Sequence, residues 1–374
     1  MTAAQHDLLL VYIGTYTRAE PHVHGRAAGI YLYQLDRATG ALTYRNTFGG
    51  VVNPSFLAIH PSGRSLYAVN EVSEFAGRAG GAVSAFAIDP HSGALTALNQ
   101  QPTHGAGPCH LSLDRSGRWL LVANYGGGSV TVLPIADAGH LGAPSAVVQH
   151  QGHSVDPARQ QAPHAHSVVV DPTNRFVLVA DLGLDKIMMY RLDETRGRLQ
   201  PHDPPWASVQ AGAGPRHLAF HPRGRYLYCI NELDSTLTVF AYDAQRGALQ
   251  AIQTLATLPP GAERRNFCAD VHVAPSGRFV YGSNRGHDSI AIFAVDDQQG
   301  TLTAIGHVAT QGRTPRNFGI DPTGDFLLVA NQDSDTILSF HIDAATGRLM
   351  PTGHVAEVPT PVCVRMLAPV PGLV

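Results

Sequence analysis

Cysteine is scarce in this sequence, and the few cysteines present show no pattern. Cys109, Cys229, Cys268 and Cys363 have no Cys-x-x-Cys spacing, and all four fall in segments that we expect to be strands. An isolated cysteine inside a strand acts as a small buried apolar side chain. A disulfide framework and a thiolate metal site are therefore not expected, and a reducing, cytoplasmic compartment is predicted.

Excess charge of one sign and long apolar runs are also missing. Only 15% of the 374 residues are charged, the net charge is −3 with histidine neutral, and no basic cluster occurs. This composition argues against nucleic acid or an anionic membrane surface as a partner. No run reaches the length of a transmembrane helix. The first residues, MTAAQHDLLLVYIG, lack the charged region and the long apolar core of a secretory signal.

Common catalytic signatures are absent as well. The sequence contains no Gly-x-Ser-x-Gly, no P-loop, and no Gly-x-Gly-x-x-Gly that follows a strand. His164 and His166 are spaced to place two imidazoles on one side of a strand, but no third ligand follows at a fixed spacing. We therefore expect no bound metal.

What the sequence does contain is a repeat. Residues 54–70 read PSFLAIHPSGRSLYAVN, and residues 215–231 read PRHLAFHPRGRYLYCIN. Four variants begin at Pro108, Ala165, Cys268 and Pro315. The middle residue of the tight turn in each copy recurs every 47 to 57 residues: Gly63, Gly117, Asn174, Gly224, Gly277 and Gly324. A period of this length, with four short apolar runs per copy, is typical of a β-propeller blade.

The two ends of the chain supply a seventh copy. Residues 8–13 and 30–35 match the second and third strands of the pattern, with no first strand before them. Residues 361–369, PVCVRMLAP, resemble a first strand that no second strand follows. We predict an all-β, seven-bladed propeller with four antiparallel strands per blade, in which the C-terminal strand completes the first blade and closes the ring. Residues 1–374 are expected to form one domain.

Two insertions and a set of variable positions point to a site. Residues 16–28 and 149–164 interrupt the repeat; long insertions of this kind are often functional loops, although the first is equally compatible with surface decoration. The second strand of six copies ends in Asn or Asp, which we interpret as structural. The residues around this position vary from copy to copy, and all of them lie at one rim of the ring because the first two strands are antiparallel. The first slot of the first strand holds Ser55, Cys109, His166, Arg216, Ala269, Arg316 and Cys363, and the second holds Phe56, His110, Ser167, His217, Asp270, Asn317 and Val364.

The channel mouth is therefore expected to gather groups of three kinds. It would hold the cations Arg216, Arg285 and Arg316, the acids Glu71, Glu232 and Asp270, and the imidazoles of His110, His164, His166 and His217. Guanidinium groups suit carboxylate or phosphate, because they offer paired donors. A glutamate beside an imidazole can share acid–base work.

Several longer motifs join these residues. They are IGTYT at 13–17, RQ at 159–160 followed by PHAHS at 163–167, GPRH at 214–217, NEL at 231–233 and SNRGHDSI at 283–290. Through them nearly the whole chain resembles the seven-bladed lactonase family, which includes propeller-type 6-phosphogluconolactonases and the 3-carboxy-cis,cis-muconate lactonizing enzyme.

The resemblance implies a catalytic set but not a single reaction, because the family holds both a hydrolase and a ring-closing cycloisomerase. The family's His, two Arg and Glu fall on His166, Arg216, Arg285 and Glu232; His164 competes with His166, which is preferred for its slot. The remaining mouth residues His164, His217, His110, Glu71 and Arg316 are expected to bind substrate, and no metal or organic cofactor is implied.

The leading hypothesis is hydrolysis of 6-phosphoglucono-1,5-lactone, with water activated by Glu232 or His166 and arginines binding the phosphate and the oxyanion. The alternatives are a cycloisomerase of the carboxymuconate lactonizing type and a non-catalytic interaction module. The expected partner is a small anionic lactone, bound by a monomer or small homo-oligomer.

Overall fold

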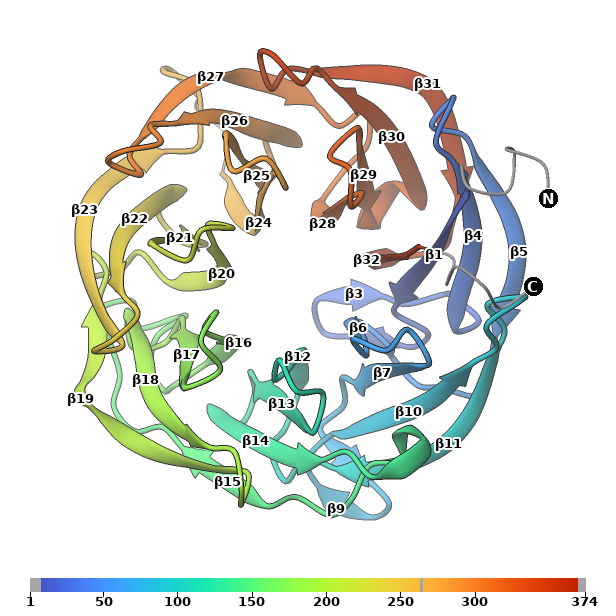
Figure 1. The fold of residues 1–374 in the computed structure, drawn as a ribbon, viewed down its shortest axis with the longest axis vertical. Coiled ribbons are helices and arrows are strands. Elements are labelled where there is room, and N and C mark those ends of the chain that lie inside the picture. The colour runs from blue at the N-terminus through green and yellow to red at the C-terminus, as the bar shows by residue number, and fades with distance from the viewer. Residues whose placement is uncertain (1–7, 263–264, 369–374) are drawn as a thin grey trace.

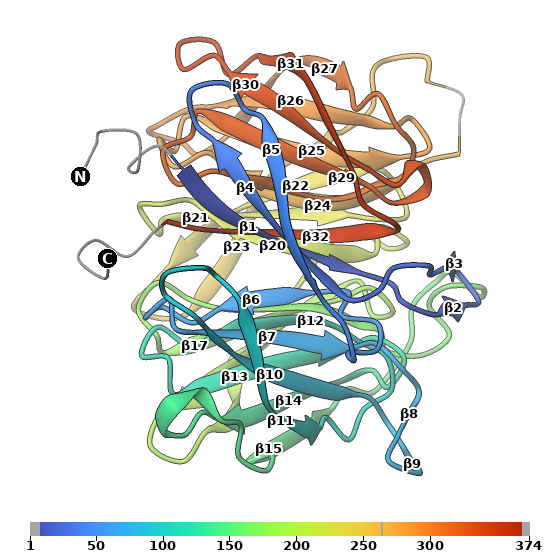
Figure 2. The same ribbon diagram turned by 90° about the vertical axis from the view of Figure 1, so that its right-hand side faces the viewer.

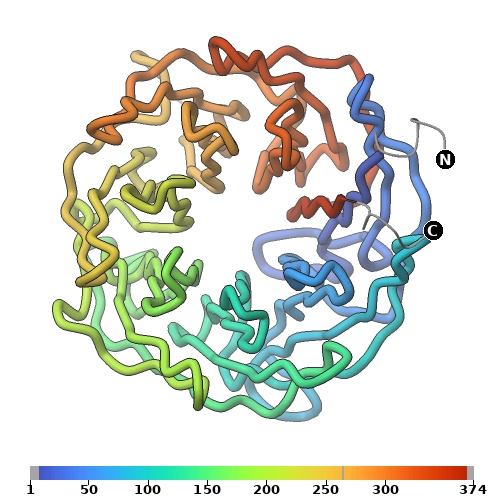
Figure 3. Tube along the Cα trace, in the orientation of Figure 1, coloured from blue at the N-terminus to red at the C-terminus, as the bar shows by residue number. Residues whose placement is uncertain are grey.

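The computed structural model describes residues 8–262 and 265–368. These residues form seven four-stranded antiparallel sheets, which are arranged in a ring around a central axis, as Figures 1 and 3 show. The predicted seven-bladed, all-β propeller is therefore confirmed. The predicted lack of a secretory signal concerns residues 1–7 in part, and these lie outside the described residues.

The strands follow the chain from blade to blade, and the innermost strand of each blade is named first here. Blade 1 consists of β32 (Pro361–Leu367), β1 (Leu8–Thr15), β4 (Ile30–Asp36) and β5 (Leu42–Phe48). Blades 2 and 3 consist of β6 (Leu57–Ile59), β7 (Ser65–Asn70), β10 (Ala82–Ile88) and β11 (Leu95–Pro102), then β12 (Pro108–Leu113), β13 (Trp119–Asn124), β14 (Ser129–Pro134) and β15 (Ala146–Gln149). Blades 4 and 5 consist of β16 (Ala165–Val170), β17 (Phe176–Asp181), β18 (Lys186–Asp193) and β19 (Arg198–Ser208), then β20 (Pro215–Phe220), β21 (Tyr226–Asn231), β22 (Thr236–Asp243) and β23 (Ala248–Ala256). Blades 6 and 7 consist of β24 (Phe267–Val273), β25 (Phe279–Arg285), β26 (Ser289–Val295) and β27 (Leu302–Ala309), then β28 (Pro315–Ile320), β29 (Phe326–Asn331), β30 (Thr336–Ile342) and β31 (Leu349–Glu357).

Two short hairpins leave the ring on one face. The pair β2 (Ala19–Glu20) and β3 (Val23–His24) lies in the first insertion, and β8 (Glu74–Phe75) with β9 (Arg78–Ala79) follows β7. Figure 2 shows both hairpins projecting from the same side. Each hairpin connects the second strand of a blade to the third, so this side is the rim at which the second strands end.

The ring is closed by pairing of the two ends of the chain. Strand β32 runs antiparallel to β1, with Ile13 opposite Val364. This pairing covers the inner edge of β1, which would otherwise be an unpaired template for aggregation at the chain ends. It confirms the closure that the sequence predicts.

The register of β32 differs by one residue from the sequence prediction. Cys363 lies opposite Gly14, as His217 lies opposite Ile230 in blade 5. The first slot is therefore filled by Val362 and the second by Cys363, rather than by Cys363 and Val364. The prediction missed this register because the start of the segment, PVCV, is a uniformly apolar run and no Pro-x-Gly turn follows the segment to mark the position.

Neighbouring blades are joined by apolar packing and by a recurring tyrosine. Val11 and Ile13 of blade 1 pack with Leu328 and Ala330 of blade 7. The hydroxyls of tyrosines in second strands donate to glycine carbonyls of the following blade, in the pairs Tyr12 with Gly93, Tyr67 with Gly139, Tyr228 with Gly300 and Tyr281 with Gly347. A buried hydrogen bond of this kind contributes about 1 kcal/mol. The repeated hydrogen bond from a tyrosine to the next blade therefore helps to fix neighbouring blades relative to each other.

The Asn or Asp that ends the second strand is structural, as interpreted from the sequence. In blade 5 the Asn231 amide donates to the hydroxyls of Thr236 and Thr238, at 2.9 and 3.0 Å. In blade 4 Asp181 accepts from the backbone N–H groups of His164 and Gly183. These buried side chains hold the loop between the second and third strands, and so fix the residue that follows them.

Within the described ranges there is no helix of the length and apolarity required to cross a membrane.

Candidate active site

A cavity of about 560 Å³ opens at the rim that carries the hairpins. Both insertions reach it, because His22 and Arg159 line its wall together with Glu232 and Arg285. A smaller chamber lies deeper in the channel, and Glu71, Cys109, His166 and Arg316 line both spaces. Most of the variable positions of the repeat thus converge on one site. Leu182, which follows Asp181 at the end of the second strand of blade 4, does not line it, because the side chain is buried and lies against Gly214. Asp270, which the sequence places at the mouth, lines neither space.

Glu232 is the electrostatic centre of this site. Its carboxylate is buried and pairs with arginines from three parts of the described chain: Arg159 at 2.6 Å, Arg216 at 2.9 Å and Arg285 at 2.9 Å. Burial opposes ionisation, but Arg285, Arg216 and Arg159 outweigh it and hold the pKa of Glu232 well below its usual range. Glu232 is therefore a permanent anion at neutral pH.

Arg216 is only 2% exposed, and most of its donors are already used. Nε donates to Glu232, while Nη1 donates to the Ala269 carbonyl and lies 3.3 Å from His217 Nε2. Nη2 has no hydrogen-bond partner among the described residues, and the residue lines the deep chamber. A guanidinium has five N–H groups, so the two on Nη2 remain for a bound molecule.

Arg285 sits beside Arg216 and also retains free donors. Its Nη2 donates to the Cys268 carbonyl at 2.9 Å and pairs with Glu232, while the buried Nε has no partner in the described part of the chain. Burial is the largest cause that lowers the pKa of Arg285 to about 10. The charges of the neighbouring Arg216 and Arg316 also lower this pKa, and Glu232 only partly opposes them. The group remains a cation at neutral pH.

The two histidines of the His-Ala-His motif have different surroundings. His166 is buried and lines both parts of the cavity, with Nδ1 3.7 Å from Cys109 Sγ. Burial and then the Arg216 charge hold the pKa of His166 well below its ordinary value, so the ring is neutral. His164 instead stacks on the Tyr125 ring at 4.6 Å and donates from Nδ1 to the Tyr125 carbonyl. His164 therefore supports a wall residue and does not itself line the cavity.

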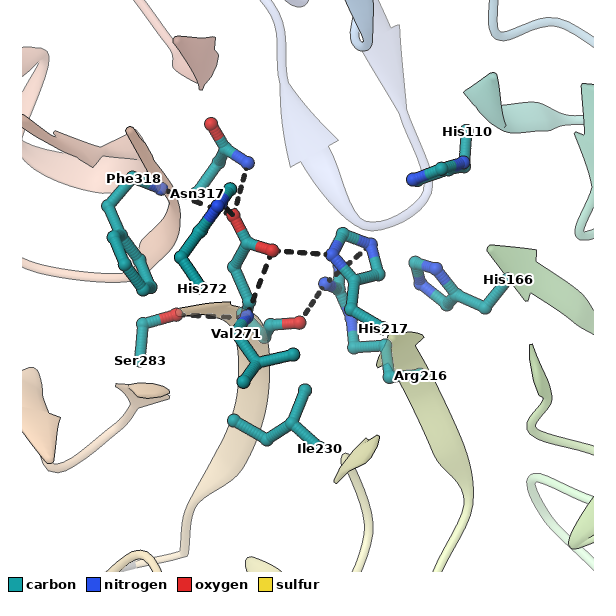
Figure 4. Close-up of polar contacts among 12 residues, drawn as sticks. His110, His166, Arg216, His217, Ile230, Val271, His272, Ser283, Asn317 and Phe318 are labelled. Atoms are coloured by element: carbon teal, nitrogen blue, oxygen red, sulfur yellow. Dashed lines mark hydrogen bonds and ion pairs between the residues drawn. The ribbon is translucent and has the colours of Figure 1, made fainter. Parts of the chain in front are cut away.

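His217 and His110 come from the same slot of their blades, and Figure 4 shows their rings next to each other. His217 lines the chamber, and its Nδ1 lies 2.7 Å from Asp270. His110 lies against the rings of Phe56 and His217, at 4.2 and 5.3 Å. It borders a separate hollow, near the Pro-x-Gly turns, rather than the candidate cavity. The structure thus brings His217 to the site and leaves His110 behind it.

Glu71 is the second carboxylate of the cavity, and its environment contrasts with that of Glu232. It accepts hydrogen bonds from the hydroxyls of Tyr16 and Ser55. Burial raises the pKa of Glu71, although Arg316 partly opposes this. Arg316 in turn lies over the Tyr16 ring, 5.8 Å from its centroid. One site thus contains two carboxylates whose pKa values are pushed apart, an arrangement that supports separate roles.

Several lining residues were not identified from the sequence. Arg159 comes from the second insertion, and Tyr16 from the first. Arg265 and Phe267 lie at the mouth, where the Arg265 guanidinium is 4.9 Å and that of Arg159 5.7 Å from the Phe267 ring. Arg265 forms no ion pair with any residue that the structure describes. The available signal was the interruption of the repeat, which marked the insertions without indicating which of their residues enter the site.

No cluster of three or more His, Cys, Asp or Glu side chains within the described residues is arranged to hold a metal ion.

Comparison with known proteins places the chain among lactonases. Residues 10–366 match the family model described as lactonase, 7-bladed beta-propeller. The 6-phosphogluconolactonase of Bacillus subtilis (strain 168) is 36% identical over 357 residues, which is 95% of this chain and 97% of that protein. That of Pectobacterium carotovorum is 39% identical over 294 residues, 78% of this chain and 81% of the relative.

Solved structures agree with the sequence relatives. A putative 6-phosphogluconolactonase from Bacteroides fragilis has a TM-score of 0.89 and 37% identity, covering 98% of this chain and 100% of that one. A periplasmic gluconolactonase from Pseudomonas aeruginosa has a TM-score of 0.90 and 35% identity, covering 97% and 100%. The predicted resemblance and the lactonase class are confirmed, and the chain belongs to the seven-bladed β-propeller lactonase family.

Proposed function

We propose that the protein hydrolyses 6-phosphoglucono-1,5-lactone to 6-phosphogluconate. The observation that carries the proposal is one cavity that combines a neutral buried imidazole, an arginine with free donors, and further cations at the mouth. The relatives named 6-phosphogluconolactonase support the phosphorylated substrate. The gluconolactonase neighbour makes the unphosphorylated lactone the natural comparison in the assay.

Arg216 is the proposed oxyanion donor. When water attacks the lactone carbonyl, negative charge develops on the carbonyl oxygen. The free Nη2 hydrogens can stabilise this charge without rearrangement, because Glu232, His217 and the Ala269 carbonyl already hold the rest of the guanidinium. Preorganised donors of this kind commonly contribute about 10²- to 10³-fold to the rate.

His166 is the better of the two candidate bases. Glu232 is paired with three guanidinium groups, so it has little tendency to take a proton. The neutral His166 can accept a proton from the attacking water, since the bound phosphate and the developing oxyanion offset the arginine charges that disfavour an imidazolium. The C1–O5 bond of the lactone then breaks, and O5 takes this proton to become the hydroxyl of the product.

We place the phosphate of the proposed substrate at the mouth of the cavity. Arg265 is an exposed cation next to Phe267 and has no carboxylate partner among the described residues. Arg285 also keeps unused donors deeper in the same wall. Guanidinium groups bind phosphate with paired hydrogen bonds, so we assign the phosphate to Arg265 with support from Arg285.

The test is hydrolysis of freshly generated 6-phosphoglucono-1,5-lactone, measured against its spontaneous rate and beside unphosphorylated gluconolactone. Rapid turnover of the phosphorylated lactone is expected. His166→Ala should lower kcat by at least about 10²-fold. An unchanged kcat in both His166→Ala and Glu232→Gln would exclude the catalytic assignment. Thermal stabilisation by a tricarboxylate instead of 6-phosphogluconate would indicate a cycloisomerase.

The remaining expectations from the sequence stay proposals. We propose that residues 1–374 unfold as one domain, because β32 joins the last blade to the first. Calorimetry should show a single transition, and size exclusion should show a monomer or small homo-oligomer. The cytoplasmic location is likewise a prediction, which fractionation of the producing cell tests.

A further inference from the structure

A buried carboxylate lies in the channel directly behind the candidate site. Asp270, in β24, is 3% exposed and receives five hydrogen bonds within the described structure. Its Oδ1 accepts from His217 Nδ1 at 2.7 Å and from the Val271 backbone at 3.0 Å. Its Oδ2 accepts from His272 Nε2 at 3.0 Å and from the side chain of Asn317 and the backbone of Phe318. Figure 4 shows this network between blades 5, 6 and 7.

These partners make Asp270 an acceptor only. Burial opposes ionisation, but His272, His217 and the other donors hold the pKa of Asp270 well below its usual range. Asn317 cannot reverse its amide to donate differently, because its Oδ1 already accepts from the Val364 backbone at 2.7 Å. The direction of every hydrogen bond to Asp270 is therefore fixed.

The fixed direction determines the tautomer of His217. A carboxylate that only accepts requires the proton of His217 to be on Nδ1, which leaves a lone pair on Nε2. Nε2 lies 3.3 Å from Arg216 Nη1, where only an acceptor is compatible with the guanidinium. The other Nη1 hydrogen is directed to the Ala269 carbonyl.

We propose that Asp270 and His217 are positioning residues that orient Arg216 for the oxyanion. The carboxylate fixes the neutral Nδ1–H tautomer of His217, and the Nε2 of this tautomer holds Arg216 so that Nη2 faces the chamber. The inference rests on the proposed lactone hydrolysis for its kinetic consequences. The tautomer itself is independent of that reaction.

His217 does not compete with His166 for the proton-transfer role. Its Nδ1 is bound to Asp270, and its Nε2 is occupied by a cation. Burial and Arg216 lower the pKa of His217 to about 4, so the ring stays neutral under physiological conditions. A neutral ring with both nitrogens engaged can hold a neighbour in place but has no free atom to accept a proton.

The first experiment measures the tautomer. ¹⁵N NMR of histidine-labelled protein, with the His217 signals assigned by their loss in His217→Gln, should show a neutral ring protonated on Nδ1 from pH 6 to 8. A ring protonated on Nε2, or a charged ring, would overturn the proposal. If the wild-type protein fails to hydrolyse the lactone, the proposed function fails, and this measurement still decides the positioning inference.

The second experiment is a double-mutant cycle with Asp270→Asn and His217→Gln. In the wild-type background Asp270→Asn should lower kcat for the lactone by about tenfold or more with little change in KM, because the oxyanion exists only in the transition state. In the His217→Gln background, Asp270→Asn should lower kcat by a much smaller factor, because Asp270 acts through His217. An equal loss in both backgrounds would refute this.

Two further variants separate positioning from folding. Asp321→Asn removes a buried carboxylate from a turn of blade 7 that also accepts backbone hydrogen bonds, and it should leave kcat unchanged. His217→Gln keeps a side-chain acceptor and should retain more kcat than His217→Phe, which has none. Should Asp270→Asn fail to fold, this pair and the NMR measurement decide the question, and equal kcat in the two His217 variants would overturn the proposal.

Discussion

Replacing Glu232 by Gln should destabilise the protein as well as impair the site. The substitution keeps the shape of the side chain but removes the negative charge shared by Arg159, Arg216 and Arg285. Removing one partner of a buried ion pair costs about 3–5 kcal/mol. The lower end applies here, because Gln retains an oxygen acceptor and Arg285 keeps the Cys268 carbonyl. We therefore expect a loss of about 3 kcal/mol in the free energy of unfolding.

This loss translates into a measurable melting shift. The entropy of unfolding is about 2.1 cal/mol/K per residue, or about 0.8 kcal/mol/K for a chain of 374 residues. A change of about 3 kcal/mol then lowers Tm by about 4 °C, which differential scanning calorimetry resolves. Glu194→Gln is the matched control: Glu194 pairs with Arg118 at 3.6 Å but is 39% exposed, so its Tm should change by less than about 1 °C.

The pH dependence of the difference tests its electrostatic origin. Folding lowers the pKa of Glu232, from about 4.3 in the unfolded chain. The stability contributed by the carboxylate is therefore complete above about pH 4.3, and it is lost as the pH falls toward the folded pKa. The gap in Tm between wild type and Glu232→Gln should be constant from pH 6 to 8 and should narrow only in acid. No gap at pH 7, or a gap that widens below pH 4, would refute the reasoning.

Three further outcomes follow from the same site and fold. Arg265→Met should raise KM for the phosphorylated lactone about tenfold or more and leave KM for unphosphorylated gluconolactone unchanged. Equal effects on both KM values would show that Arg265 does not bind the phosphate. Because the pKa of His166 in the free protein lies below its ordinary value of about 6.5 and the neutral ring is the base, kcat/KM should be flat from pH 7.5 to 6 and fall only in more acidic buffer. An acidic decline of the pH–rate profile with its midpoint near pH 7 would contradict this. Truncation after Glu357 removes β32 and exposes β1, so size exclusion should show aggregates, whereas truncation after Ala368 leaves β32 whole and should elute as wild type.

The fold was largely predictable from the sequence because each blade corresponds to one copy of a sequence repeat. Each copy carries its own turn glycine and its own apolar alternation, so the number of blades and the closure by the last strand can be read along the chain. The same alignment placed Arg216, Glu232 and Arg285 at one rim, because equivalent positions of equivalent strands must lie at equivalent heights in the ring. Where the marker turn is missing, after β32, the register was wrong by one residue.

The composition of the site was decided by contacts between distant segments. Arg159 reaches Glu232 across 73 residues of sequence, and it comes from an insertion for which the repeat gives no position. His110 and His217 occupy the same slot in their copies, yet only His217 lines the chamber, because His110 lies behind it against Phe56.

The sequence by itself determined the ring and the kinds of charge at its mouth. The protonation states and the directions of the hydrogen bonds were decided only by tertiary structure, as the five donors around Asp270 show. The physical reason is that pKa values and tautomers depend on burial and on neighbours within a few ångströms, and these neighbours are brought together from different blades when the ring closes.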